Sequence, residues 1–417
     1  MVKKWWNEKV AYQIYPKSFY DTNGDGIGDL RGVIEKLDYL KDLGVDIIWL
    51  SPCYRSPLAD QGYDISDYYD IDPRFGTMAD MDELIAEAKK RDMYILMDLV
   101  VNHCSDEHEW FKKACEDPDG KYGNFFYLRD KKEGELPTNW RSYFGGPVWE
   151  DLPGTNKQYL HVFHKKQPDL NWENPVVRDE VFNMMTWWCE KGVDGFRMDV
   201  ISMISKPEGL PDGKIPEGGL YGDSGCVNGP HVHEYLQEMN REVLSKYDLM
   251  TVGECAGVTI EEAEKYASAD GKELSMVFQF ELVDLASGTY GKWTDKRVPL
   301  KDFKRVMTAW QTELEGKAWN SLFLGNHDQP RCLSRFGDDS PEYRVVSAKM
   351  LATCLHMMQG TPYVYQGDEL GMKNVPFHDL SEFRDIESIN AFHELTGAGK
   401  VAPDDMMRYL NLRGRDN

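Results

Sequence analysis

The chain has 417 residues, 41% of them hydrophobic and 12% aromatic, which is enough to fill the core of a large domain. Its formal net charge of −23 excludes binding to nucleic acid or to an anionic membrane and favours a neutral or cationic ligand. No apolar run reaches the roughly eighteen residues of a membrane span, and no apolar run of a secretory signal follows the first lysines. Eight scattered cysteines without a C-x-x-C pair indicate reduced core thiols, so we expect a cytoplasmic protein.

Apolar runs of strand length alternate with segments of helical periodicity from one end of the chain to the other. This alternation predicts parallel strands joined by crossover helices. The expected strands are residues 11–16, 45–52, 94–103, 194–200, 250–254, 275–281, 320–328 and 362–369. The expected helices include residues 30–43, 78–91, 177–191, 231–247, 260–267, 300–314 and 343–359.

Several of these strands end in polar residues, among them His103, Asp199, Glu254 and Asp328. Polar groups at the carboxyl ends of buried parallel strands are typical of the active site of a (β/α)8 TIM barrel. A doubly wound sheet is the alternative, but no G-x-G-x-x-G follows the first strand. We therefore predict an α/β protein with a (β/α)8 barrel made of residues 1–103 and 175–417.

The connection between the third strand and its helix, residues 104–174, is far longer than the usual two to six residues and is rich in Gly, Pro, Tyr and Trp. It predicts a small inserted domain that overhangs the strand ends. Phe144, Phe163 and Gln167 lie in it and are candidates for lining a substrate cleft. The alternative for the aromatic residues is that they form the core of the insert itself.

Oxygen-bearing residues alternate with glycines after the first strand, as in a loop that binds a hard cation. The candidate ligands are Asp21, Asn23, Asp25, the carbonyl of Ile27, and Asp29. The match to an EF-hand is partial, because Gly32 stands at the twelfth position and a strand precedes the loop. We expect one structural Ca²⁺ or Mg²⁺, with a solvated acidic turn as the alternative.

The stretch Gly195-Phe-Arg-Met-Asp-Val200 puts Arg197 and Asp199 on the same face of a strand end. An adjacent arginine lowers the pKa of an aspartate, so Asp199 is expected to be an ionised nucleophile. A structural ion pair is the alternative for this hexapeptide.

Two further acids at strand ends complete a set suited to glycoside cleavage with retention of configuration. Glu254 follows an apolar run and has no cation next to it in the sequence, so we expect it to keep a raised pKa and to act as the proton donor. Asp328, beside His327, is expected to hold sugar hydroxyls and to distort the ring. His103 is a further donor at this rim, and Tyr63 offers a ring on which a pyranose can stack.

Four segments resemble the ordered motifs of the α-amylase family of glycoside hydrolases. They are Asp98-Leu-Val-Val-Asn-His103, Gly195-Phe-Arg-Met-Asp-Val200, Glu254, and Phe323-Leu-Gly-Asn-His-Asp328. The similarity covers nearly the whole chain and is greatest to the oligo-1,6-glucosidase and dextran glucosidase branch.

This resemblance implies a retaining α-glucosidase with Asp199 as nucleophile, Glu254 as acid/base and Asp328 as transition-state stabiliser. It places His103, Arg197 and His327 around the cleaved glucose. Asp60 and Tyr63 match positions that close the subsite of the non-reducing end, which implies an exo-acting enzyme. The positions matched with α-1,6 linkages are Val200, Lys292 and Glu369.

Related activities remain as alternatives. Trehalose-6-phosphate hydrolases share most of these motifs but need cations for a phosphate, and no basic cluster is evident near the predicted site. An α-1,4-glucosidase and a sucrose isomerase are further enzymatic alternatives. A barrel-like accessory subunit of a transporter is the non-enzymatic one, which we disfavour because all three acids are present. We expect an oligosaccharide substrate and a monomer.

The end of the chain carries a last expectation. In this branch of the family, a long loop after the eighth strand leads to an arginine. This arginine and the counterpart of Asp60 together contact the terminal glucose. The sequence ends at Arg413-Gly-Arg-Asp-Asn417, so we expect a truncated chain that lacks its closing helix and a C-terminal β-domain. Such a chain would leave Asp60 unpaired, expose an apolar face of the barrel and have little activity.

Overall fold

The computed structural model describes residues 3–216 and 221–415. Its main sheet has eight strands, which run parallel in the order β11-β10-β9-β5-β2-β1-β13-β12. They are β1 (Ala11–Ile14), β2 (Ile47–Leu50), β5 (Tyr94–Leu99), β9 (Gly195–Met198), β10 (Met250–Cys255), β11 (Met276–Gln279), β12 (Ser321–Leu322) and β13 (Thr361–Tyr365). The Ser321 hydroxyl donates to the Val277 carbonyl at 2.7 Å and links the two end strands. The predicted (β/α)8 barrel is thereby confirmed.

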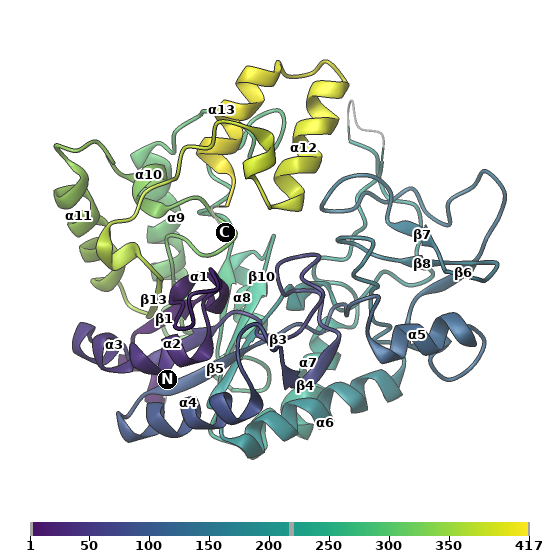
Figure 1. The fold of residues 1–417 in the computed structure, drawn as a ribbon, viewed down its shortest axis with the longest axis horizontal. Coiled ribbons are helices and arrows are strands. Elements are labelled where there is room, and N and C mark those ends of the chain that lie inside the picture. Colours follow the sequence, from purple (N-terminus) through teal and green to yellow (C-terminus); the bar gives the residue numbers. More distant parts are fainter. Residues whose placement is uncertain (1–2, 217–220, 416–417) are drawn as a thin grey trace.

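Helices follow the barrel strands and cover the outside of the sheet (Figure 1). They are α2 (Leu30–Glu35), α3 (Leu37–Leu43), α4 (Met78–Lys90), α6 (Pro175–Lys191), α7 (Val232–Glu242), α8 (Ile260–Tyr266), α9 (Leu300–Glu313) and α11 (Arg344–His356). The shorter helical elements of the chain outside the insert are α1 (Pro16–Phe19), α10 (Cys332–Phe336), η1 (Trp5–Glu8), η3 (Ile201–Met203), η4 (Leu244–Lys246), η5 (Asp368–Leu370) and η6 (Leu380–Glu382). Within the described ranges, none of the helices has the length and apolar character needed to cross a membrane.

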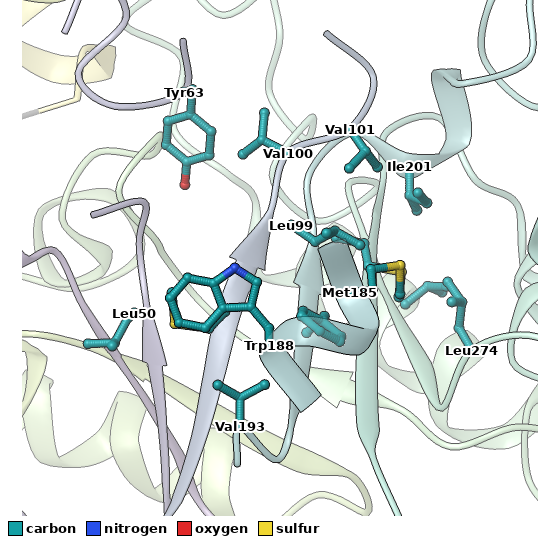
Figure 2. Close-up of a cluster of buried hydrophobic side chains, with 14 of the residues drawn as sticks. Leu50, Tyr63, Leu99, Val100, Val101, Met185, Trp188, Val193, Ile201 and Leu274 are labelled. Atoms are coloured by element: carbon teal, nitrogen blue, oxygen red, sulfur yellow. The ribbon is translucent and has the colours of Figure 1, made fainter. Parts of the chain in front are cut away.

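The boundaries of α6 show how local sequence sets an element. The Asn174 side chain accepts a hydrogen bond from the Val176 amide at 3.0 Å, Pro175 occupies the first turn, and Gly192 ends the helix in a left-handed conformation. Trp188 and Met185 of this helix pack among Leu50, Leu99 and Val193, the cluster that Figure 2 shows. This burial fixes the helix against the outer face of the barrel.

Residues between β5 and α6 form the inserted unit, drawn to the right of the barrel in Figure 1. It contains α5 (Glu109–Glu116), η2 (Gly123–Phe125) and an antiparallel sheet, β6-β8-β7, made of β6 (Leu128–Asp130), β7 (Trp149–Asp151) and β8 (Lys157–Leu160). A second hairpin, β3 (Tyr54–Arg55) and β4 (Asp67–Ile71), lies after β2. Trp140 donates to the Pro211 carbonyl at 2.8 Å, so the insert also packs against the connection after β9.

A fully buried ion pair joins the insert to the barrel. The Lys206 ammonium lies 2.7 Å from the Asp169 carboxylate, and both side chains are inaccessible to solvent. The same ammonium donates to Asn102 at 2.7 Å, next to His103 at the rim of the barrel. A buried pair of this kind is costly to break because either partner alone is an uncompensated charge.

Two α-helices follow β13, in a segment for which the sequence pattern predicted no element. They are α12 (Ile386–Gly397) and α13 (Pro403–Arg413), drawn in yellow above the barrel in Figure 1. Their apolar faces share a small core with Trp293 of the barrel, together with Phe383, Leu395, Met406 and Leu410. This core directs the chain back to the rim and carries Arg415 into it, while residues 416–417 lie outside the described ranges.

Candidate active site

Arg197 lies at the centre of the acidic cluster at the carboxyl ends of the strands. Its Nη1 is 2.8 Å from Asp98 and 2.7 Å from Asp199, and its Nη2 is 2.6 Å from Glu254. The guanidinium is fully buried and lies over the Trp49 ring, at 5.1 Å from the ring centroid. One cation therefore holds three carboxylates from three neighbouring strands.

The expectation that Glu254 lacks a cation is wrong. Strands β9 and β10 pair with Arg197 opposite Val252, and this register brings the Glu254 carboxylate beside the guanidinium. Glu254 also accepts a hydrogen bond from the Val200 amide at 3.1 Å. Neighbours in the sequence could not show this pairing because it crosses between strands.

The expected direction for the pKa of Asp199 is also reversed. Burial raises the pKa of Asp199 and outweighs the lowering by Arg197, while the carboxylates of Glu254 and Asp98 raise it further. Burial likewise raises the pKa of Asp98 to about 6. Because one guanidinium is shared among three carboxylates, the cluster favours retaining a proton.

Asp328 lies on the other side of the same rim. Burial raises the pKa of Asp328, but His327 and Arg415 lower it by more, so the net direction is downward. His327 is 3.2 Å from this carboxylate, and its Nδ1 lies 2.9 Å from the Gln13 amide. Burial lowers the pKa of His327 to about 3, so the ring is neutral near pH 7.

Arg415 is a site residue that was not predicted from the sequence. Its guanidinium contacts Asp328 at 2.6 Å, Asp385 at 2.7 Å and Asp60 at 3.3 Å. The expectation that Asp60 is unpaired is therefore wrong, because the chain itself supplies the arginine. The sequence contains the arginine, in Arg413-Gly-Arg415, but no local pattern shows that it pairs with an aspartate more than 350 residues away.

Asp60 and its neighbours close one end of the site. Gln167 donates to Asp60 at 3.0 Å and to the Tyr63 carbonyl at 3.1 Å, and its amide lies 3.2 Å from His103. Burial raises the pKa of Asp60 to about 6 and lowers that of His103 to about 4. Gln167 was expected to line the cleft, but it is fully buried and instead positions Asp60 and His103.

The Tyr63 ring is fixed on two sides. Its hydroxyl donates to Asp98 at 3.0 Å, and one face stacks on His327 with the ring centroids 5.0 Å apart and the planes 8° apart. The Arg197 guanidinium also lies over this ring, 5.7 Å from its centroid, so Tyr63 is packed among site residues as well as bordering the cavity.

These residues border a cavity of about 380 Å³. Its lining contains most of the predicted site residues, namely Asp60, Tyr63, His103, Phe144, Phe163, Asp199, Val200, Glu254, Lys292, His327 and Asp328. It also contains residues that were not predicted, namely Tyr143, Met203, Ala256, Phe280, Asp284, Gln329, Glu387 and Arg415. Asp98, Gln167 and Arg197 lie behind this lining and act through the side chains that they contact.

Val200 has an unusual backbone for a β-branched residue, with φ 36° and ψ 38°. This conformation turns the chain directly after β9 and directs the Val200 amide to Glu254. Strain of this kind persists at sites where the surroundings fix it.

Lys292 and Glu387 form an ion pair at the border of the cavity. Glu387 belongs to the first turn of α12, so it could not be found without that helix.

Glu369, expected near the substrate, is placed elsewhere. Its carboxylate accepts hydrogen bonds from the hydroxyls of Tyr12 and Tyr39, each at 2.9 Å. It borders a separate, mostly apolar groove, whose lining includes Val45, Leu351 and Leu355. Of the three residues matched with α-1,6 linkages, Val200 and Lys292 border the cavity and Glu369 does not.

The candidate metal loop is formed largely by its own backbone. Asp21 accepts hydrogen bonds from the amides of Gly24 and Gly26, at 2.7 and 2.8 Å, and Asn23 and Asp25 accept similar bonds two residues on. Asp29 is the N-cap of α2, where it accepts from Gly32 at 2.7 Å and from Thr22. Over residues 3–216 and 221–415, no three His, Cys, Asp or Glu side chains are grouped as metal ligands.

The donor chemistry of this loop nevertheless suits a hard cation. Asp21, Asn23 and Asp25 are exposed, and hydrogen bonds from Gly26 and Gly24 lower the pKa of Asp21. Asp29 is engaged at the helix end, so a cation would depend on the first three side chains and the Ile27 carbonyl.

Residues 13–417 match the family described as alpha amylase, catalytic domain. The chain belongs to the α-amylase family. It is a glycoside hydrolase. Among its relatives is an oligo-1,6-glucosidase of Parageobacillus thermoglucosidasius, 58% identical over 419 residues, which cover the whole of this chain and 74% of that protein. A trehalose-6-phosphate hydrolase of Bacillus subtilis is 51% identical over 99% of this chain and 73% of its own length.

Solved structures of the family superpose closely on the barrel and the insert. The isomaltulose synthase of Klebsiella sp. LX3 has a TM-score of 0.96 at 44% identity, over 100% of this chain and 75% of the other. The trehalose-6-phosphate hydrolase of Bacillus licheniformis has a TM-score of 0.90 at 50% identity, over 100% and 74%. The α-amylase fold is thus shown, while members that share it differ in substrate.

Proposed function

We propose that this glycoside hydrolase is an exo-acting α-glucosidase that cleaves α-1,6 linkages of isomaltose, panose and isomalto-oligosaccharides from the non-reducing end. The observation that carries the proposal is the closed end of the cavity, where Arg415 joins Asp60 to Asp328. A chain of sugars cannot pass through this end, so only a terminal glucose fits there. Oligo-1,6-glucosidases of three further organisms are 51–56% identical to the chain, which supports the linkage.

In the proposed mechanism, Asp199 attacks the anomeric carbon and Glu254 protonates the leaving oxygen. The Arg197 guanidinium contacts both carboxylates and fixes their relative orientation. The first step requires Asp199 to be ionised and Glu254 to be protonated. Asp328 and the neutral His327 are positioned to hold hydroxyls of the same glucose.

The charge of the cavity disfavours the alternative of trehalose-6-phosphate. Its lining contains six acids, Asp60, Asp199, Glu254, Asp284, Asp328 and Glu387, but only two basic side chains, Lys292 and Arg415. Both bases are already paired with acids. A phosphate dianion would enter a field of its own sign, whereas a neutral saccharide would not.

Initial rates on isomaltose, panose, maltose and trehalose-6-phosphate test the proposal. We expect isomaltose and panose to be cleaved well ahead of maltose, and trehalose-6-phosphate to be the poorest substrate. Equal or faster cleavage of maltose would overturn the linkage, and preference for the phosphorylated sugar would overturn the substrate class.

We also propose that the loop containing Asp21, Asn23 and Asp25 binds one divalent cation, Ca²⁺ or Mg²⁺, and that the ion stabilises the fold without taking part in the chemistry. None of the loop residues borders the cavity.

We further propose that the protein is cytoplasmic and monomeric. Its eight free cysteines support the cytoplasmic location.

A further inference from the structure

Two contacts join α12 to the inserted domain beside the active-site cavity. Both terminal nitrogens of Arg141 donate to the Glu394 carboxylate, at 2.8 and 2.9 Å. The Asn390 amide donates to the Phe144 carbonyl at 2.8 Å. These two contacts, Arg141 to Glu394 and Asn390 to Phe144, are called the clasp below.

The same helix is also fixed to the barrel side of the cavity. Glu387 pairs with Lys292, and Asp385, the N-cap of α12, contacts Arg415 at 2.7 Å. Glu387, Asn390 and Glu394 are spaced by three and four residues, which puts them on one face of the helix. This face of α12 therefore bridges the barrel rim and the insert.

Burial distinguishes the floor of the cavity from its mouth. Asp60, Tyr63, His103, Asp199 and Glu254 are buried, whereas Tyr143 of the insert is 42% exposed. Lys292 and Glu387 are each 29% exposed on the opposite side. The mouth thus lies between the insert and α12, and the clasp connects its two sides.

We propose that the clasp limits the width of the mouth and so selects short, unbranched saccharides against long or branched ones. The inference rests on the proposed cleavage of isomalto-saccharides, because it concerns the part of the substrate that extends out of the cavity. The fit at the clasp is close: a Cβ atom on Gly145 would lie 3.1 Å from the Glu394 carboxylate. Arg141 and Glu394 are therefore specificity-determining residues that do not contact the reacting atoms.

The clasp depends on a charge pair that water can reach. The side chains of Arg141 and Glu394 are 47% and 35% exposed. Salt screens an exposed pair much more than a buried one. High ionic strength should therefore open the mouth in the same direction as a mutation does.

The test is the ratio of kcat/KM for dextran to kcat/KM for isomaltose. We expect Arg141→Ala to raise this ratio several-fold and to leave kcat/KM for an aryl α-glucoside, which has no extended saccharide, unchanged. The charge exchange Arg141→Glu with Glu394→Arg should return the ratio towards that of the wild type. High salt should raise the ratio in the wild type but not in Arg141→Ala.

A matched control removes another exposed ion pair of the insert, the one between Lys131 and Asp151. Lys131→Ala should leave the ratio unchanged, since this pair does not reach α12. An unchanged ratio in Arg141→Ala, or an equal loss on all three substrates, would overturn the role of the clasp. If the wild type failed to cleave isomaltose, the linkage proposal would fall instead, and the same ratio measured on malto-saccharides of increasing length would still decide the inference.

Discussion

The guanidinium of Arg415 lies 2.6 Å from the carboxylate of Asp328, although 87 residues separate the two in the sequence. Two helices, α12 and α13, make this contact possible because they fold over the barrel and return the chain to its rim. The arrangement makes Arg415, which follows α13, part of the active site. Segments after the eighth strand therefore matter for catalysis as well as for stability.

Replacement of Arg415 should show this dependence. Arg415→Ala leaves Asp60, Asp328 and Asp385 without their shared cation, so kcat/KM for isomaltose should fall about a hundred-fold or more. Arg413 provides the control, because it donates to the Thr294 and Lys296 carbonyls and not to the acids. Arg413→Ala should lower the melting temperature with little change in KM. Equal kinetic losses in the two variants would show that Arg415 acts only through stability.

The roles of the two central acids can be assigned by chemical rescue. Asp199→Ala and Glu254→Gln should each reduce kcat by about 10⁴-fold or more, because the two side chains act as a unit. Azide should restore activity to Asp199→Ala and form a glycosyl azide of inverted anomeric configuration. In Glu254→Ala, azide should form a glycosyl azide of retained configuration. Product configuration is read by NMR, and the reverse pattern would exchange the two roles.

The barrel and the three acids could be predicted from sequence, because apolar strand runs and polar strand ends are local signals. Interactions between side chains on different strands could not be predicted in this way. The contact of Arg197 with Glu254 depends on the register of β9 and β10, and it reverses the charge environment expected for Glu254.

Residues supplied by unexpected helices were missed for a similar reason. Glu387 and Arg415 reach the cavity only because α12 and α13 pack over the rim. Two polar residues were placed wrongly on the basis of their type. Glu369 accepts hydrogen bonds from Tyr12 of β1 and Tyr39 of α3 and does not border the cavity, and Gln167 is buried behind the cavity. A polar residue near a motif can therefore support the site, or lie away from it, without bordering the cavity.

Linkage preference should respond to the residue after the nucleophile. Val200 borders the cavity and has a left-handed backbone conformation. Another β-branched residue at this position can adopt the same conformation. Val200→Thr adds a hydroxyl without changing this shape, and we expect the ratio of maltose to isomaltose hydrolysis to rise several-fold. Val200→Ala is the control for lost volume. If Val200→Thr leaves the ratio where it was, Val200 does not set the linkage.

Removal of divalent cations should affect stability and not chemistry. A ligand that binds only the native state raises the melting temperature, so a chelator should lower it by several degrees. Asp21→Asn should remove most of this response, since Asp21 is the first carboxylate of the loop. Ca²⁺ and Mg²⁺ are then added back separately, and the ion that restores the melting temperature is the one that the loop binds. If a chelator slowed isomaltose cleavage without changing the melting temperature, the ion would instead take part in the reaction.

A histidine on the outer layer should make stability depend on pH. His233 of α7 lies 2.9 Å from Glu273 and 3.4 Å from Glu262 of α8, and the hydrogen bond to Glu273 raises the pKa of His233 above its usual value of 6.5. A raised pKa in the folded state means that the stabilisation is complete below about pH 6.5 and is lost as the pH rises through the folded-state value. The difference in melting temperature between the wild type and His233→Gln should therefore be largest near pH 6 and should disappear at about pH 9. His231→Gln is the control: His231 pairs with Glu208 and Glu234 at the exposed surface, where water weakens the interaction, so its effect should be smaller. A difference that grows towards alkaline pH would show that neutral His233, and not its cation, stabilises the contact between α7 and α8.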